Sequence, residues 1–100
     1  MDKDFLRFED AAAQHRLVLL HGWGADLEDL VPLGEELIKT NKLAIELVAL
    51  RAPEDHPDGI GKQWYQLFPA DWAAIPSATE NLKERIITLA NKEIPLEKTI

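Results

Sequence analysis

The chain has no cysteine and only one serine, Ser77. The lack of cysteine excludes disulfides and thiol chemistry, but it does not identify a compartment because secreted proteins can also lack cysteine. No apolar run approaches the roughly 18 residues that span a bilayer. The start at Asp2-Lys3-Asp4 does not lead into a signal peptide. We therefore expect a cytoplasmic protein with no membrane span.

Basic residues are also scarce. The chain has 11 Lys and Arg against 18 Asp and Glu, which gives a formal net charge of -7 and a pI near 4.8. Nucleic acids and anionic membrane surfaces both require clustered positive charge, so this balance argues against either as a partner. The hydrophobic share of 46% is ordinary for a globular protein, and 100 residues suit one domain with a small core.

Three apolar segments predict strands. Leu17–Leu20 is continuously apolar, which favours a strand covered on both faces of a sheet. Phe5–Phe8 is a possible short strand, and Leu43–Leu50 contains another apolar strand. A helix is expected between the strands at Leu17–Leu20 and Leu43–Leu50. This order of strand, helix and strand predicts that the two strands are parallel and joined by a right-handed crossover.

Two helices are expected from apolar residues at helical spacing. The first begins near Asp29, with Asp26 or Asp29 as its cap, and ends at Asn41. The second follows the capping box Ser77–Glu80 and is ended by Pro95. Their apolar stripes consist of Leu27, Leu30, Val31, Leu37 and Ile38 in the first, and of Leu82, Ile86, Leu89 and Ala90 in the second.

The segment 54–75 has no periodic pattern because proline and glycine interrupt it repeatedly. Loops of this length inside compact domains are often functional. This one carries Trp64, Tyr65, Phe68 and Trp72. Trp64 and Trp72 either contact a substrate or close over the sheet as core residues, and the sequence favours neither. After the second helix, 97–100 is typical of the beginning of another strand.

The most informative motif follows the apolar run 17–20. There the chain reads His21-Gly22-Trp23-Gly24, so a buried strand ends abruptly in a glycine turn. Such a turn points backbone N–H groups into the space above a sheet, which is the geometry that binds an oxyanion in acyl transfer. No Gly-x-Ser-x-Gly elbow occurs in the 100 residues, so the nucleophile that this turn would serve is missing.

The chain resembles the N-terminal half of an α/β-hydrolase of the phospholipase/carboxylesterase family, which includes the acyl-protein thioesterases. Five segments carry the resemblance in family order: 17–26, Glu28–Leu30, Arg51–Pro53, Gln63–Tyr65 and the last helix with Ile94–Pro95. Leu27 departs from the small residue that the family often has there. The resemblance implies an α/β fold, with a mostly parallel sheet and flanking helices, in which residues 1–100 form the N-terminal part of a single domain that stops before the nucleophile elbow.

The resemblance also implies site residues and a reaction. The backbone N–H of Trp23 would be one oxyanion donor, supported by Gly22 and Gly24, and the second donor would be the residue after the missing serine. The triad Ser, Asp and His would lie after Ile100, so this chain alone would be inactive. Trp64, Tyr65 and Leu67 would lie beside the acyl pocket. The implied function is a serine carboxylesterase or thioesterase acting on a small-molecule or lipid acyl ester, without cofactor or metal.

Several other interpretations stay open. His21 is most simply a structural residue whose ring bonds the neighbouring backbone, and the spacing of His15, His21 and His56 matches no metal template. Ser77 fits a helix cap better than a nucleophile. An acidic cluster is expected to be a solvated helix face; it comprises Asp26, Glu28, Asp29, Glu35 and Glu36.

Two alternative functions also remain. One is a non-catalytic interaction domain that self-associates through an open sheet edge. The other is a hydrolase of the dienelactone-hydrolase type, which uses a cysteine nucleophile.

Overall fold

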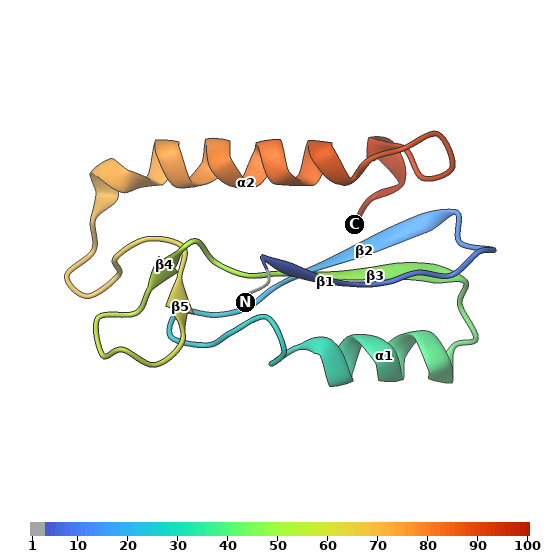
Figure 1. The fold of residues 1–100 in the computed structure, drawn as a ribbon, viewed down its shortest axis with the longest axis horizontal. Helices are drawn as coiled ribbons and strands as arrows, with labels where there is room; N and C mark the ends of the chain where they lie inside the picture. The colour runs from blue at the N-terminus through green and yellow to red at the C-terminus, as the bar shows by residue number, and fades with distance from the viewer. Residues whose placement is uncertain (1–3) are drawn as a thin grey trace.

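The computed structural model describes residues 4–100, in which two helices lie on opposite faces of a three-stranded sheet (Figure 1). The strands are β1 (Phe5–Phe8), β2 (His15–Leu20) and β3 (Ile45–Leu50), in the order β1-β3-β2. The three expected strands are thus confirmed. The expectation about a signal peptide concerns Asp2 and Lys3, which lie outside the described residues.

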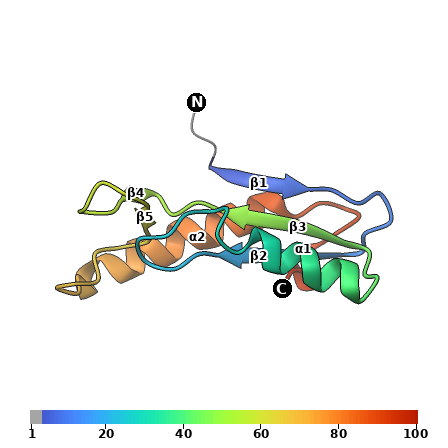
Figure 2. The same cartoon turned by 90° about the horizontal axis from the view of Figure 1, so that it is seen from below.

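The sheet is mixed, and the prediction of a mostly parallel sheet was wrong. β2 runs parallel to β3, whereas β1 runs antiparallel to it. The connections explain the difference, because a parallel crossover needs about a dozen residues or more. The link 21–44 between β2 and β3 holds a helix and is long enough, but the link 9–14 between β1 and β2 only reverses the chain. Figure 2 shows β1 at one edge of the sheet, with β3 between β1 and β2.

The helix α1 (Val31–Thr40) starts later than expected. Its N-cap is Leu30, which makes no side-chain cap bond, and Pro32 occupies its first turn. The Asp29 carboxylate instead accepts the Asp26 N–H at 2.7 Å, so both aspartates order the turn before the helix. The stop at Asn41 is confirmed, since its side-chain amide donates to the Leu37 carbonyl oxygen at 2.8 Å.

The helix α2 (Ile75–Leu89) also differs from expectation at both ends. It continues from a 3-10 turn, η1 (Trp72–Ala74), so Ser77 lies inside its first turn and makes no cap bond. The capping box was therefore wrong. At the other end Ala90 is extended, and the helix stops well before Pro95. A second 3-10 turn, η2 (Leu96–Lys98), follows.

Part of the expected irregular loop is ordered. β4 (Glu54–Asp55) and β5 (Lys62–Gln63) pair antiparallel as a short hairpin. Strands of two residues carry no periodic signal, so the pattern of the sequence could not predict them.

The core has two halves, one on each face of the sheet. Alternate residues of β3 point to opposite faces, and because each face carries a helix, Leu47–Leu50 is buried throughout. The half beneath α1 contains Leu27, Val31 and Ala49 with Leu6 and Leu19. The half beneath α2 contains Val48, Leu50 and Leu89 with Val18, Trp64, Leu82 and Ile86.

A buried ionic cluster crosses the sheet. The Glu46 carboxylate on β3 pairs with Arg16 on β2 and, at 3.2 Å, with Arg7 on β1. Arg16 is 0% exposed and also donates to the Ile94 carbonyl oxygen at 3.2 Å, while Arg7 donates to the Leu89 carbonyl oxygen at 3.3 Å. The two arginines thus bond the end of α2 and the segment after it to the sheet, and Glu46 pairs with both of them.

The segment after η2 joins the free side of β2. Thr99 bridges Arg16 in parallel, the Val18 N–H donates to the Ile100 carbonyl oxygen, and the Ile100 N–H donates to the Arg16 carbonyl oxygen, both at 2.8 Å. The expected strand start at 97–100 is therefore confirmed only for Thr99 and Ile100, because Glu97 and Lys98 belong to η2. Within residues 4–100 no strand pairs with the outer edge of β1. None of the helices in this range is long and apolar enough to cross a membrane.

Candidate active site

The glycine turn lies at the carboxyl ends of β2 and β3. Leu20 and Leu50, the last residues of the two parallel strands, are partners, so His21 and Arg51 both follow at the same end of the sheet. The hairpin β4–β5 and the first turn of α2 lie at this end too (left in Figure 1). Loops at the carboxyl ends of parallel strands are the usual place for a binding site in an α/β sheet.

The His21 ring is a structural element, as expected. It is buried, and its Nε2 accepts the Ala52 N–H at 3.0 Å, while its Nδ1 lies 2.9 Å from the Gly22 carbonyl oxygen. Because Nε2 accepts, the ring proton must sit on Nδ1 and be donated to that oxygen. Both nitrogens are used, so His21 is not placed to act as a base.

His21 thereby orients the next peptide unit. The Gly22 carbonyl and the Trp23 N–H belong to one planar trans peptide, so they point in opposite directions. The carbonyl oxygen is held by His21 and by the Ala25 N–H at 3.1 Å. The Trp23 N–H therefore points away from both donors, and it has no acceptor within residues 4–100.

The turn depends on glycine at Gly24 but not at Gly22. Gly24 has φ +81, a region that favours glycine. Gly22 has no positive φ, and a Cβ there would meet nothing within 4 Å, so the expected support from Gly22 is not required by the backbone. A backbone donor that is fixed in direction and has no acceptor within residues 4–100 is suited to bind an anionic oxygen.

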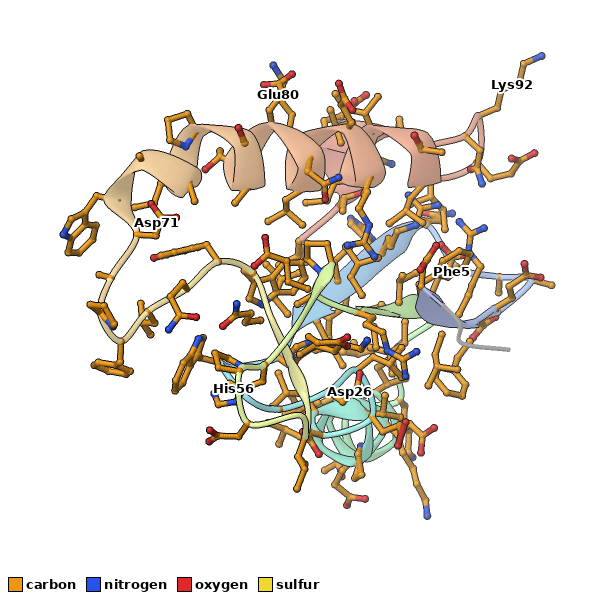
Figure 3. All side chains as sticks on the ribbon, turned by 60° about the vertical axis from the view of Figure 1, so that its left-hand side comes forward. Phe5, Asp26, His56, Asp71, Glu80 and Lys92 are labelled. Carbon is orange, nitrogen blue, oxygen red and sulfur yellow. The ribbon has the colours of Figure 1, made fainter. Side chains whose placement is uncertain are left out.

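The side chain of Trp23 is held by the hairpin. Its indole N–H donates to Gln63 Oε1 at 2.9 Å, and its ring meets the His56 ring edge-on with centroids 4.1 Å apart. Phe68 packs against it on a further side at 5.2 Å. Figure 3 shows His56 in the hairpin turn, and Asp71 near the start of α2.

The residues expected beside an acyl pocket occupy different environments. Trp64 belongs to the core beneath α2, and its indole N–H donates to the His21 carbonyl oxygen at 2.8 Å. Tyr65 and Leu67 are half-buried in the loop that follows. The exposed aromatic residues of the segment 54–75 are Phe68 and Trp72, at 70% and 71%. Trp64 is thus a core residue, whereas Trp72 lies on the open surface.

Asp26 forms an ion pair rather than belonging to a solvated acidic face. Its carboxylate accepts from Arg51 Nε at 2.8 Å and from the Leu27 N–H at 2.7 Å. Burial acts to raise the pKa of this carboxyl, but the hydrogen bonds and the positive charge of Arg51 outweigh it and hold the pKa below the usual 3.8. The pair ties the turn after β2 to the end of β3.

Neither Ser77 nor the histidines form a further site. Ser77 is exposed in the first turn of α2. His15 begins β2 whereas His21 follows its end, and within the described residues no three His, Cys, Asp or Glu side chains are grouped to hold a metal ion.

A cavity of about 400 Å³ is lined by residues of β1 and α2, among them Arg7 and Arg85, and by none of residues 21–26. Both arginines donate to backbone carbonyl oxygens, Arg7 to that of Leu89 and Arg85 to that of Arg51.

Sequence reasoning missed Gln63 and His56 as parts of this site. They reach Trp23 only through the hairpin, and Gln63 lies 40 residues from it in the chain. No family model matches this chain, and no curated protein matches its sequence significantly.

Proposed function

We propose that this chain supplies the oxyanion-binding half of a serine esterase or thioesterase of the phospholipase/carboxylesterase type, which cleaves small-molecule or lipid acyl esters. The observation that carries the proposal is the Trp23 N–H, which is directed by His21 through the Gly22 carbonyl and has no acceptor within residues 4–100. The resemblance of the segments 17–26 and 51–53 to that family agrees with it.

The strand order supports the same proposal. Thr99 pairs with Arg16 in parallel, and Leu20 lies four residues after Arg16 along β2. If the chain continued in the same direction, the residue four positions after Thr99 would lie beside Leu20. A nucleophile elbow following that strand would then put its serine next to the Trp23 N–H, which is the arrangement that the reaction needs.

In the proposed reaction, the serine Oγ attacks the acyl carbonyl while a histidine outside these residues accepts its proton. The carbonyl oxygen becomes an oxyanion, and the Trp23 N–H and the N–H of the residue after the serine donate to it. The alcohol or thiol leaves with the proton from the histidine, and water then hydrolyses the acyl-enzyme. One donor of this kind contributes about 2.7–4 kcal/mol to the transition state.

The proposal is tested by weighing the purified protein before and after treatment with a fluorophosphonate, which labels an activated serine. A mass above 11.3 kDa that gains one adduct, mapped to a serine other than Ser77, supports it. An 11.3 kDa protein without an adduct, or an adduct on Ser77, overturns it.

One observation favours a second candidate, an interaction domain. The outer edge of β1 has no strand partner within the described range, and Phe5 and Phe8 there are 42% and 40% exposed. Such an edge is a template for pairing with another chain. If this is the function, the molar mass in solution rises with concentration, and adding a charge by Phe5→Lys keeps the protein monomeric.

A further inference from the structure

We propose that Gln63 is a positioning residue that fixes the direction of the Trp23 N–H through the Trp23 indole. Its catalytic consequence rests on the proposed esterase function, whereas the positioning itself is a property of the fold. The proposal concerns the hairpin β4–β5, which joins the glycine turn through backbone, side-chain and ring contacts.

The backbone contacts come first. The Gly24 N–H donates to the Lys62 carbonyl oxygen at 2.8 Å, and the Lys62 N–H donates to the Ala25 carbonyl oxygen at 2.7 Å. Gly61 allows this close approach, because a Cβ there would lie 2.0 Å from the Gly24 carbonyl oxygen. The residues after Trp23 are thus bonded to the hairpin in a fixed register.

The Gln63 amide then fixes the indole. The indole N–H can only donate, so Gln63 must present its Oε1 to Trp23. Its Nε2 donates to Glu54 Oε1 at 3.1 Å, on the facing strand of the hairpin. Gln63 itself is buried, with 5% of its surface exposed, whereas Glu54 is exposed. The amide can make both bonds in one orientation only.

His56 limits the indole on a second side. The ring is 8% exposed, and its Nδ1 accepts the Asp58 N–H at 3.1 Å, which holds it in the hairpin turn. A Cβ at Gly24 would lie 3.3 Å from His56 Cδ2, so the ring also packs against the turn itself. With its indole bonded to Gln63 and in edge-on contact with His56, Trp23 has little freedom to rotate its backbone N–H.

Gln63 connects Trp23, whose backbone N–H has no acceptor within residues 4–100, to Glu54 on the facing strand of the hairpin. Catalytic donors must be held within about 0.5 Å of their working position, and a displacement of about 1 Å can reduce a rate about a hundredfold.

The first experiment compares Gln63→Leu with the unchanged protein by NMR on the ¹⁵N-labelled full chain. Gln14→Leu, the same change at an exposed site before β2, is the matched control. We expect Gln63→Leu to speed hydrogen exchange of the Trp23 indole and to broaden or shift the Trp23 amide signal. The Trp64 indole, which bonds the His21 carbonyl oxygen, stays protected and reports that the fold is intact. A Trp23 amide that is unchanged while its indole exchanges faster overturns the proposal.

The double variant Gln63→Glu with Glu54→Gln exchanges the two partners. It keeps an acceptor for the indole and a donor between the strands, so we expect it to restore the Trp23 amide signal. Gln63→Glu alone puts two carboxylates opposite each other and should not. Failure of the double variant to restore the signal, while the Trp64 indole remains protected, contradicts the assigned pairing.

The catalytic consequence is read from kcat and KM with a short acyl ester. Gln63→Leu should lower kcat about tenfold or more and leave KM within about twofold, because the donor acts on the oxyanion and not on the bound ester. An unchanged kcat in a protein with a displaced Trp23 amide overturns the catalytic part. If the protein takes no fluorophosphonate adduct, the esterase proposal fails, and the NMR comparison still decides the positioning.

Discussion

The variant Glu46→Gln should destabilise the fold strongly, because it removes the carboxylate between Arg7 and Arg16. Arg16 is 0% exposed, and its other partners, the Ile94 carbonyl oxygen and Thr99 Oγ1, carry no charge. Within residues 4–100, Arg16 Nη2 is buried without a hydrogen-bond partner, so the guanidinium depends on Glu46 for its charge pairing. The variant leaves a buried guanidinium without a counter-charge.

Breaking such a pair by removing one partner costs about 3–5 kcal/mol, out of the about 5–15 kcal/mol by which a domain is stable. With a urea dependence of about 1.5 kcal/mol per M, the unfolding midpoint should fall by about 2–3 M. Tryptophan fluorescence in a urea titration measures this shift. Glu93→Gln, the same change at an exposed position, should stay within about 0.5 kcal/mol of the unchanged protein.

The double variant Arg16→Met with Glu46→Met separates the loss of charge pairing from the loss of packing. It removes both buried charges, so it should cost less than Glu46→Gln alone. The reasoning is refuted if Glu46→Gln changes the free energy of unfolding by less than about 1 kcal/mol, or if the double variant is the less stable of the two.

Three further predictions concern the glycine turn and its supports. The pKa of Asp26 is lowered below 3.8 in the folded protein. Its ionised form therefore adds stability above pH 3.8, and this stability is lost as the pH falls through the folded pKa. In urea titrations at several pH values, Asp26→Asn should be less stable than the unchanged protein by about 1 kcal/mol at pH 7 and equally stable at the acid end. His21→Leu leaves a buried backbone N–H after β3 without its acceptor and should cost about 1–3 kcal/mol in the same assay. Gly61→Ala should lower the thermal unfolding midpoint far more than Gly59→Ala. The two glycines have nearly the same φ, +80 and +79, but only at Gly61 would a Cβ lie against the Gly24 carbonyl oxygen, at 2.0 Å. Equal midpoints would contradict this close approach.

Much of the fold followed from hydrophobic pattern. The runs that became β2 and β3 and the stripes of α1 and α2 were visible because each contributes apolar residues to the two halves of the core. The direction of β1 was not predicted, because it depends on the length of the link 9–14 rather than on the residues of the strand. The start of α2 was missed because η1 leads directly into it and leaves Ser77 inside its first turn.

The site was predictable only in part. The motif 21–24 located the turn and the Trp23 N–H, since glycine turns after buried strands have a local signature. The supports of Trp23 arise from contacts between segments far apart in the chain, so the sequence assigned neither Gln63 nor His56 a contact with Trp23. The pairing of Glu46 with Arg16 was hidden in the same way, inside segments that otherwise appear apolar.

The central claim is that the Trp23 N–H donates to an oxyanion. It is tested most directly by following the Trp23 amide signal in the ¹⁵N-labelled protein while a fluorophosphonate reacts. We expect a single adduct on a serine and a downfield shift of the Trp23 amide signal, because the phosphonyl oxygen accepts the Trp23 N–H. An adduct that leaves the Trp23 signal unmoved, or no adduct at all, would contradict it.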